Sequence, residues 1–412
     1  MVSPFMPDAE KLAAVRAALP SLGAGIQLNT GSVGPLPAEA AAAMAELAAY
    51  ERDVGRADFG YYLELLQRID EARAGVAAVI GADIDEVALT HATTDGLNLG
   101  TWSVDWSPGD VAVTTTHEHA GGLGPLYPLR DRLGVDLRFA DFDGDASEAE
   151  VLAAFDRAIV PGTRLVSTSH VLWTTGMVLP VEQIAALAHE RGAVVLVDGA
   201  QAVGAIPVRA PDLGVEMYSL PAQKWLLGPE GMGALWVQRS YLEVAQPTFG
   251  GHFSMADYDS RGSYRPFPDA RRFEVSPFNR PNVVGMARSI GWLTMFVGLD
   301  FVYRRGPAMA RWAADRLAAI PGVTVLTPRE RMATLVTFRI AGWPVEVALD
   351  ELAARTFAIA RTVPPVDALR ISVGFWATEE ELEQFLGGVR LLAAHTPETI
   401  PPRRSLAMLG QP

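Results

Sequence analysis

Short runs of apolar and β-branched residues alternate with segments of helical period between about residue 85 and residue 240. Runs of this kind predict buried strands, whereas VEQIAALAHERG (181–192) has apolar residues three or four apart and a closing glycine, which predicts a helix. The predicted strands are 87–91, 111–116, 136–142, 163–171, 193–200, 216–220 and 233–237. This alternation predicts an α/β fold whose mostly parallel seven-stranded sheet is covered by helices on both faces. Ligands of such sheets bind at the carboxyl ends of the strands, so residues just after each strand are candidates for a functional site.

The pattern changes after this region. Residues 244–283 are rich in Gly, Pro, Phe and Ser with few periodic runs, which predicts an extended excursion. One long helix is predicted over 283–305, and mixed helix and strand patterns follow it. We therefore expect an N-terminal segment (1–40) that packs with a small domain, a large ligand-binding domain (41–284), and that small α+β domain at the C-terminal end (285–412).

Composition narrows the class of protein. The 412 residues are 49% apolar, and no uninterrupted apolar run reaches the ~18–20 residues of a membrane span. The first residues lack the basic-then-apolar order of a secretory signal, so a cytoplasmic location is expected. The net charge of −14, without any run rich in Lys or Arg, argues against nucleic acid as a partner. The composition therefore favours a small-molecule partner.

Two residue counts bear on chemistry. Cysteine is absent, which excludes disulfides, thiolate metal sites and a cysteine nucleophile, and no metal site is predicted. Lysine occurs only at Lys11 and Lys224, while arginine supplies the remaining cationic side chains. Lys224 stands in an apolar, glycine-rich segment, and an amine is the side chain that can form an imine. By count alone, Lys224 is a candidate for imine chemistry, and chance survival of a structural lysine is the alternative.

Two neighbouring segments carry a resemblance to a known family. VLVDGAQAVGAIPV contains Asp198, and AQKWLLGPEGMGALWV (222–237) contains Lys224, at a separation of 224 − 198 = 26 residues. In this order they resemble the fold-type I pyridoxal-phosphate enzymes of the class V aminotransferase family. That family includes cysteine desulfurases, cysteine/cystine C–S lyases and isopenicillin N epimerase-like proteins. The resemblance implies pyridoxal 5′-phosphate as cofactor and a homodimer with active sites at the subunit interface.

The resemblance also implies roles at the cofactor ring. Lys224 would hold the cofactor as a Schiff base and move the proton of the substrate α-carbon. Asp198 would keep the ring nitrogen protonated, although a strand-end Asp also commonly starts a turn. Gln201 would bond the phenolic oxygen, with a solvated turn residue as the alternative. His119, in TTTHEHAGG (114–122), would stack on the ring and is preferred to His117.

The cofactor phosphate needs backbone donors at a helix start together with hydroxyl groups. THATTDGLNLG (90–100) supplies Thr93 and Thr94 where a helix follows a strand, an arrangement that is also an ordinary helix cap. Where the family has Ser or Thr and then His before the lysine, this chain has Pro221 and Gln223. Proline offers neither hydroxyl nor N–H group. The further candidate phosphate contacts are Ser219, Gln223 and, from the neighbouring subunit through QPTFGGHF (246–253), Thr248 and Gly250.

The substrate side departs from the desulfurases. ALRISVGFWATEEELEQF (368–385) matches the family's Arg-x-Ser segment and nominates Arg370 for the substrate α-carboxylate, with Arg361 as a second candidate. SHVLWTTGMVLP (169–180) has Leu172 and Trp173 where desulfurases have Ser-Asn, which is similar to the C–S lyases. Trp173 is therefore a candidate substrate contact. Two others, Asn29 and Gly31 in LNTGSVGPLP (28–37), match the loop that closes over the substrate.

These features predict a pyridoxal-phosphate-dependent C–S lyase that cleaves an S-substituted cysteine by β-elimination to a thiol, pyruvate and ammonia. A role in the biosynthesis of sulfur-containing natural products is compatible with the altered pocket. The alternatives are an aminotransferase, an epimerase or a decarboxylating deaminase acting on an amino acid or a cysteine conjugate. A separate class of hypothesis is a cofactor-binding protein without turnover. A standard cysteine desulfurase is disfavoured because no cysteine can accept the sulfur.

Overall fold

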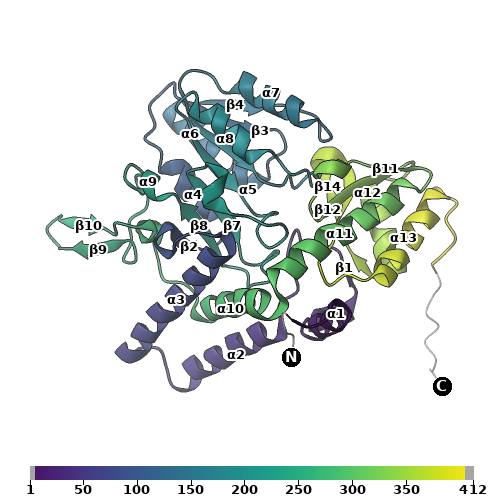
Figure 1. Cartoon of the computed structure of the whole chain (residues 1–412), viewed down its shortest axis with the longest axis horizontal. Coiled ribbons are helices and arrows are strands. Elements are labelled where there is room, and N and C mark those ends of the chain that lie inside the picture. Colours follow the sequence, from purple (N-terminus) through teal and green to yellow (C-terminus); the bar gives the residue numbers. More distant parts are fainter. Residues whose placement is uncertain (1–4, 404–412) are drawn as a thin grey trace.

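A seven-stranded sheet forms the centre of the larger part of the protein in a computed structural model that describes residues 5–403 (Figure 1). Its strands are β2 (Val87–Thr90), β3 (Val111–Thr115), β4 (Asp136–Ala140), β5 (Thr163–Ser169), β6 (Val194–Asp198), β7 (Met217–Pro221) and β8 (Gly233–Val237). The strand order is β2-β8-β7-β6-β5-β3-β4. All neighbours from β7 to β4 are parallel, whereas β8 runs antiparallel to both β2 and β7. The prediction of a mostly parallel seven-stranded sheet is confirmed.

Alternate residues along the strands enter different apolar clusters, which explains why the strands read as continuous apolar runs. In β6, Val195 and Val197 belong to one cluster, whereas Leu196 belongs to another on the opposite face. Burying both faces removes each such side chain from water, which stabilises the fold by about 1.5–3 kcal/mol per residue. The helices of this region are α2 (Ala38–Asp53), α3 (Phe59–Ile80), α4 (Thr93–Trp102), α5 (Ala120–Leu123), α6 (Leu126–Leu133), α7 (Glu148–Ala158), α8 (Val181–His189), α9 (Arg239–Leu242) and α10 (Arg280–Gly291). Of these, α4 packs on β6, β7 and β8, whereas α7 and α8 contribute to the cluster on the opposite face.

A second, antiparallel sheet lies in the C-terminal part, in the order β11-β12-β15-β14. Its strands are β11 (Val323–Val325), β12 (Leu335–Ile340), β14 (Arg361–Val363) and β15 (Ala368–Ser372). The accompanying helices are α1 (Asp8–Ala17), α11 (Leu299–Ala318), α12 (Val345–Thr356) and α13 (Glu379–Ala393). The N-terminal strand β1 (Ile26–Gln27) pairs with β13 (Ala358–Ile359), and Ile26 belongs to the apolar cluster of this part. The domain boundaries at residues 40 and 284 stay predictions.

The prediction of a single long helix over 283–305 is wrong. Helix α10 ends at Gly291, a π-helical turn covers Trp292–Val297, and α11 starts at Leu299. Gly298 separates the two helices with φ at +86°, a conformation that glycine adopts without a steric penalty. Its N–H donates to the carbonyl of Leu293, five residues earlier, so the local hydrogen bonding has already left the α-helical pattern.

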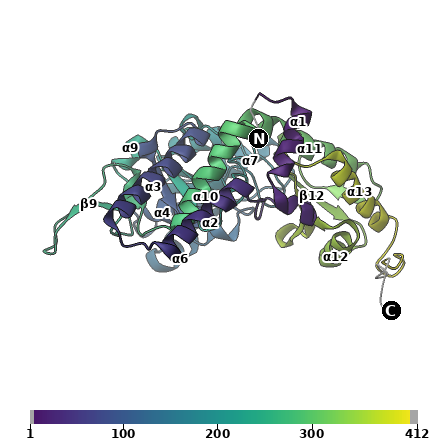
Figure 2. The ribbon, with the colours of Figure 1, turned by 90° about the horizontal axis from the view of Figure 1, so that it is seen from below.

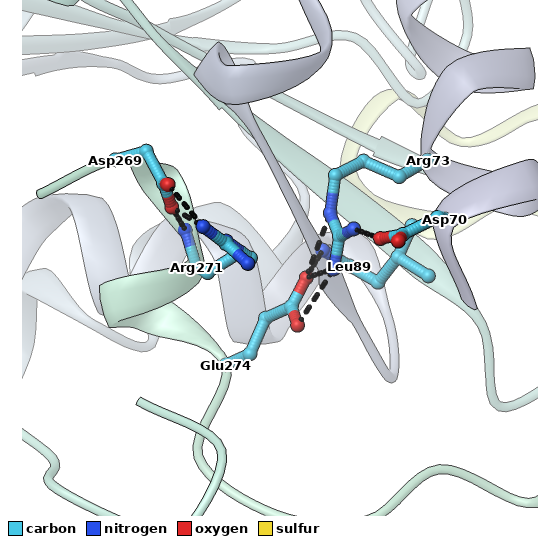
Figure 3. Close-up of polar contacts among 6 residues, drawn as sticks. All are labelled: Asp70, Arg73, Leu89, Asp269, Arg271 and Glu274. Carbon is cyan, nitrogen blue, oxygen red and sulfur yellow. Dashed lines mark hydrogen bonds and ion pairs between the residues drawn. The ribbon is translucent and has the colours of Figure 1, made fainter. Parts of the chain in front are cut away.

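The excursion over 244–283 contains a hairpin, β9 (Met255–Tyr258) and β10 (Tyr264–Pro266), that stands away from the rest of the protein in both views (Figures 1 and 2). The segment returns to the large sheet through Glu274, which is buried and forms an ion pair with Arg73 of α3 at 2.8 Å (Figure 3). Glu274 also accepts a hydrogen bond of 2.9 Å from the N–H of Leu89. Because β2 is an edge strand, that N–H has no partner within the sheet.

The contacts of Glu274 therefore fasten both α3 and the excursion to strand β2. Figure 3 also shows Asp70 against the same Arg73 guanidinium and a neighbouring pair between Asp269 and Arg271. Strand β2 leads directly into the start of α4, where the predicted phosphate contacts lie. No helix within residues 5–403 is long and apolar enough to cross a membrane, and the cytoplasmic location stays a prediction.

Replacing Glu274 tests the importance of this anchor. In Glu274→Ala, the Arg73 charge stays buried without its main partner and the Leu89 N–H loses its acceptor, so we expect a loss of about 3–5 kcal/mol in the free energy of unfolding. The control is Asp315→Ala, which breaks an ion pair with Arg329 whose side chains are 51% and 47% exposed. Such a surface pair contributes about 0–1 kcal/mol. Urea denaturation measures both variants, and equal losses would contradict the anchor.

Candidate active site

A cavity of about 220 Å³ lies where the carboxyl ends of the large sheet meet strands β14 and β15 of the small sheet. The loops that follow β2, β3, β5, β6 and β7 all reach it, as does the N-terminal loop before α2. The sequence-predicted residues that line it are Gly31, Thr93, Thr94, His119, Trp173, Asp198, Gln201, Gln223, Lys224, Arg361 and Arg370. Residues spread over more than 300 positions of the sequence thus share one small space.

Four predicted site residues do not line this cavity. Ser219 is fully buried and its hydroxyl donates to the carbonyl of Thr93 at 2.9 Å, so it supports the start of α4 from behind. Asn29 accepts from the hydroxyl of Ser32, a residue that does face the cavity.

The other two residues lie on the excursion. Thr248 and Gly250 are exposed there, and the Thr248 hydroxyl donates to the carbonyl of Trp102. The structure gives these positions no place in the site of their own chain, and their action on a neighbouring subunit stays a proposal.

The loop after β7 holds Lys224 with its backbone tightly enclosed. The N–H of Gly34 in the N-terminal loop donates to the carbonyl of Gln223 at 2.7 Å, and a Cβ at Gly34 would collide with the carbonyl of Lys224. Three residues further on, Leu227 has φ at +55°, which is unusual for a residue with a side chain. The N-terminal loop therefore sets the position of the lysine backbone, and glycine is required at position 34.

Burial and neighbouring charges set the protonation of Lys224. Burial lowers its pKa to about 8, Asp198 opposes this effect, and Arg370 adds to it. Burial in turn raises the pKa of Asp198. The charge of Lys224 and the hydrogen bond from the N–H of Ala200 partly oppose this rise. One carboxylate oxygen of Asp198 accepts that N–H at 2.8 Å. A lysine with such a pKa has an appreciable neutral fraction near neutral pH, as a nucleophile or a base requires.

Gln201 and His119 have distinct surroundings. The side-chain amide of Gln201 donates to the carbonyl of Gly31 at 2.8 Å and accepts from the indole N–H of Trp225 at 3.0 Å, which leaves one N–H for a ligand. His119 packs edge-to-face on Trp173 with ring centres 5.2 Å apart, and burial lowers its pKa. His117 instead binds the carbonyl of Phe142 at 2.8 Å and does not line the cavity.

Two guanidinium groups face the cavity. Arg370 is fully buried, and one of its nitrogens donates to the carbonyl of Trp173 at 2.6 Å, while Nε and Nη2 have no partner. Burial lowers its pKa to about 9, and the charge of Arg361 adds to this effect. Arg361 donates to the hydroxyl of Ser32 at 3.1 Å and lies 5.5 Å from the ring centre of Trp173. Within residues 5–403 neither arginine forms an ion pair, so both are available to an anionic ligand.

The other end of the cavity has the features of a phosphate site. Helix α4 begins at Thr93, and its N-cap residue Ala92 provides no side chain to bind the first N–H groups. Thr93 and Thr94 line the cavity beside those groups. The side-chain oxygen of Gln223 is buried and has no hydrogen-bond partner in the part of the chain that the structure describes. Free N–H groups at a helix start bind anions well because the helix dipole favours negative charge there.

The residue motifs did not identify Ser32, Ser169 or Glu118. Ser32 and Ser169 line the cavity, and Glu118 is buried directly behind Ser169. Ser169 is the last residue of β5, so the rule that ligands bind beyond strand ends could have found it. Glu118 lies inside the motif that supplied His119, but its contacts with Ser169 are to another strand, which no local pattern reveals.

Comparisons with known proteins agree with this arrangement. The sequence matches the family Aminotransferase class-V over residues 32–385. A probable cysteine desulfurase of Mycolicibacterium paratuberculosis is 32% identical over 79% of this chain and 49% of its own length, so the chain spans about half of that relative. The isopenicillin N epimerase of Streptomyces clavuligerus is 30% identical over 87% of this chain and 92% of its own length.

A solved structure is similar over nearly its full length. The cystine C–S lyase C-DES, in complex with its product cysteine persulfide, superposes with a TM-score of 0.84 and 26% identity, covering 90% of this chain and 99% of that one. A second C-DES structure, with a TM-score of 0.85, 26% identity and coverage of 91% of this chain and 98% of that one, holds glycine covalently linked to the pyridoxal-phosphate cofactor. These similarities and the family match confirm pyridoxal phosphate as the cofactor.

The residues present fit this cofactor. Residues 5–403 contain no group of three or more His, Asp or Glu that could hold a metal ion. The uncapped start of α4 suits a phosphate, Asp198 suits a ring nitrogen, and Lys224 suits an aldehyde. The fold, the cavity and the match over residues 32–385 lead to one conclusion: the chain belongs to the aminotransferase class-V family.

Proposed function

We propose that this protein is a C–S lyase that cleaves an S-substituted cysteine by β-elimination. In the net reaction, one substrate molecule and one water give a thiol, pyruvate and ammonia, so the sulfur leaves with the substituent and the α-proton is removed. The observation that carries the proposal is that the Lys224 amine shares its cavity with two arginines that have no carboxylate partner in the described chain. A second candidate is epimerisation, which needs the same proton removal and is favoured by the similarity to the Streptomyces enzyme.

The chemistry divides between the cofactor and the chain. When bound, pyridoxal phosphate supplies an electron sink for the electron pair left on the substrate α-carbon. Lys224, neutral in part because of burial, takes the proton from that carbon. Arg370 holds the α-carboxylate through its two unpaired nitrogens and so orients the α-proton towards the lysine. Arg370 is fully buried, so little water screens its interaction with a bound carboxylate, which strengthens that interaction.

The composition supports a lyase over a standard desulfurase. The chain has no cysteine, so no thiolate of its own can take the sulfur from the substrate. In β-elimination the sulfur departs on the substituent and needs no acceptor on the protein. C-DES, the similar structure, is itself described as a cystine C–S lyase.

We propose further that the S-substituent carries an anionic group. Arg370 suffices for one carboxylate, whereas Arg361 presents a second guanidinium beside Ser32 and the ring of Trp173. Two like charges in one buried cavity destabilise each other, and a ligand with a second negative group would relieve this. The proposed homodimer, in which Thr248 and Gly250 reach a neighbouring site, is supported by their exposed position next to the protruding hairpin.

A substrate panel tests the reaction. We expect the purified holoenzyme to release pyruvate and thiol in equal amounts from S-substituted cysteines, measured by coupled lactate dehydrogenase and thiol assays. Lys224→Ala should lower turnover by more than about 10²-fold because it removes the base, whereas Lys11→Arg should retain activity. Racemised substrate or an oxo acid without thiol would contradict the lyase assignment. Borohydride reduction and peptide mass analysis should find the cofactor on Lys224 and not on Lys11.

Substitution of the two arginines should change KM for different sets of substrates. Arg370→Lys removes the paired hydrogen bonds to the α-carboxylate, at about 1.5–3 kcal/mol, and should raise KM by about 10- to 100-fold for every substrate. Arg361→Lys should raise KM mainly for substrates with an anionic S-substituent and leave S-alkyl cysteines nearly unchanged. Equal effects of Arg361→Lys on both substrate types would contradict the anionic substituent.

The pH dependence of cofactor uptake tests the charge coupling in the cavity. Only the neutral amine of Lys224 reacts with the cofactor aldehyde, so uptake by the apoprotein should rise about tenfold per pH unit below its pKa and level off above it. The pKa of Lys224 is about 8, and Asp198 raises it. Asp198→Asn should therefore shift the profile to lower pH, as followed by stopped-flow absorbance. A shift to higher pH would contradict the coupling, and Asp315→Asn should leave the profile unchanged.

A further inference from the structure

Glu118 is a buried carboxylate that does not line the cavity. One of its oxygens accepts hydrogen bonds from the hydroxyls of Thr115 at 2.9 Å and Thr168 at 3.4 Å, and from the backbone N–H of Ser169 at 3.0 Å. The other oxygen has a single contact, at 2.5 Å, with the hydroxyl of Ser169. Only 7% of the Glu118 surface is exposed, so bulk water does not replace its hydrogen bonds within the protein. Within residues 5–403, Ser169 is thus the only hydrogen-bond partner of Glu118 that lines the cavity.

Ser169 stands between Glu118 and Asp198. Ser169 and Asp198 are register partners at the ends of the parallel strands β5 and β6, so their α-carbons are about 5 Å apart. Both residues line the cavity. They also have the same alternation along their strands as Leu165 and Leu196, which lie in one apolar cluster, so their side chains leave the sheet on the same face. The Ser169 hydroxyl thus donates to the carboxylate of Glu118 and lies on the same face of the sheet as the side chain of Asp198.

A hydroxyl group has one proton to donate, and the state of Glu118 decides where it goes. When Glu118 is ionised, Ser169 donates to it, and Asp198 receives no hydrogen bond from Ser169. When Glu118 takes up a proton from solvent, it donates to the Ser169 oxygen, and the hydroxyl proton is free to turn towards Asp198. A hydrogen bond to the ionised form of a carboxylate makes that carboxylate less basic.

We propose that Glu118 is a positioning residue that sets the direction of the Ser169 hydroxyl and thereby the basicity of Asp198. This inference rests on the proposed placement of the cofactor ring nitrogen at Asp198. With Glu118 ionised, Asp198 is more basic and holds the ring nitrogen in its protonated form more firmly. With Glu118 protonated, that hold weakens, and so does the electron-withdrawing power of the ring.

The charges around Glu118 place this change in an accessible range. Burial raises the pKa of Glu118 to about 7, the Ser169 hydrogen bonds oppose this, and the charge of Asp198 adds to it. From the adjoining loop, His119 faces the cavity, and the ring of His117 is directed to Thr174 and the carbonyl of Phe142.

The remaining charged groups lie across the cavity. They are Lys224, Arg361 and Arg370. All three lower the pKa of His119, and the two arginines also lower the pKa of Lys224.

The test follows the ring nitrogen directly. Holoenzyme loaded with ¹⁵N-labelled pyridoxal phosphate is titrated across pH 7, and the ¹⁵N chemical shift of the ring nitrogen is recorded without substrate. We expect a step near pH 7 in the wild type, with more protonated nitrogen on the alkaline side. Glu118→Gln should abolish the step, and Ser169→Ala should reduce it because only the through-space effect of the Glu118 charge remains. Thr115→Val should keep the step but move it to higher pH, because the Thr115 hydrogen bond stabilises the ionised form.

Two results would overturn the inference: an unchanged step in Glu118→Gln, or an unchanged step in Ser169→Ala. A merely structural Glu118 would lower stability in the Gln variant and leave the titration intact. If Glu118→Gln does not retain the cofactor, Ser169→Ala and Thr115→Val decide the question alone. The variant Asp198→Asn distinguishes failure of the cofactor placement from failure of the role of Glu118. If it leaves the nitrogen shift unaltered, the cofactor placement fails, whereas an altered shift with a persistent step in Glu118→Gln defeats only the role of Glu118.

Discussion

The mutual influence of two buried groups of opposite charge, Lys224 and Asp198, is the constraint around which the site is built. Burial disfavours the charged form of each, and the charge of each opposes that effect in the other. Burial thereby lowers the pKa of the amine and raises the pKa of the carboxylate, so small changes around either shift the balance. A cofactor that needs an amine at one end and a carboxylate at its ring nitrogen uses both tendencies.

The cavity exists only because three parts of the chain meet. The large sheet supplies Asp198 as the last residue of β6 and Lys224 just beyond β7, and the small sheet supplies Arg361 and Arg370. The N-terminal loop closes the gap, because Gly34 binds the backbone next to the lysine and Gly31 is held by Gln201. A side chain at Gly34 would collide with the backbone carbonyl of Lys224, whereas one at Gly31 would collide with the guanidinium of Arg370.

Two buried glutamates away from the cavity follow the same physical rule. Glu274 accepts the N–H of Leu89 on an edge strand, and Glu118 accepts the N–H of Ser169 at the end of an inner strand. A buried N–H without a partner is costly, and a carboxylate is a strong acceptor. Each glutamate also joins segments far apart in the sequence, so each holds a strand that leads towards the cavity. The charge of Arg73 lowers the pKa of Glu274 against the effect of burial, whereas the hydrogen-bond donors to Glu118 are uncharged hydroxyl and backbone groups.

The sequence by itself determined the seven strands and their sheet, because a strand buried on both faces is a short apolar run whatever surrounds it. It also determined Asp198 and Lys224 as candidates, since both stand in local motifs directly after such runs. The break at Gly298 was missed because apolar spacing continues through a π-helical turn. Only the tertiary structure decided that Arg361 and Arg370 face the lysine without carboxylate partners among residues 5–403 and that Ser219 lies behind the cavity. It also decided that Glu118 hydrogen-bonds to Ser169, the register partner of Asp198. These are contacts between strands and loops distant in sequence, and their geometry and the burial that shifts each pKa arise only when the chain has packed.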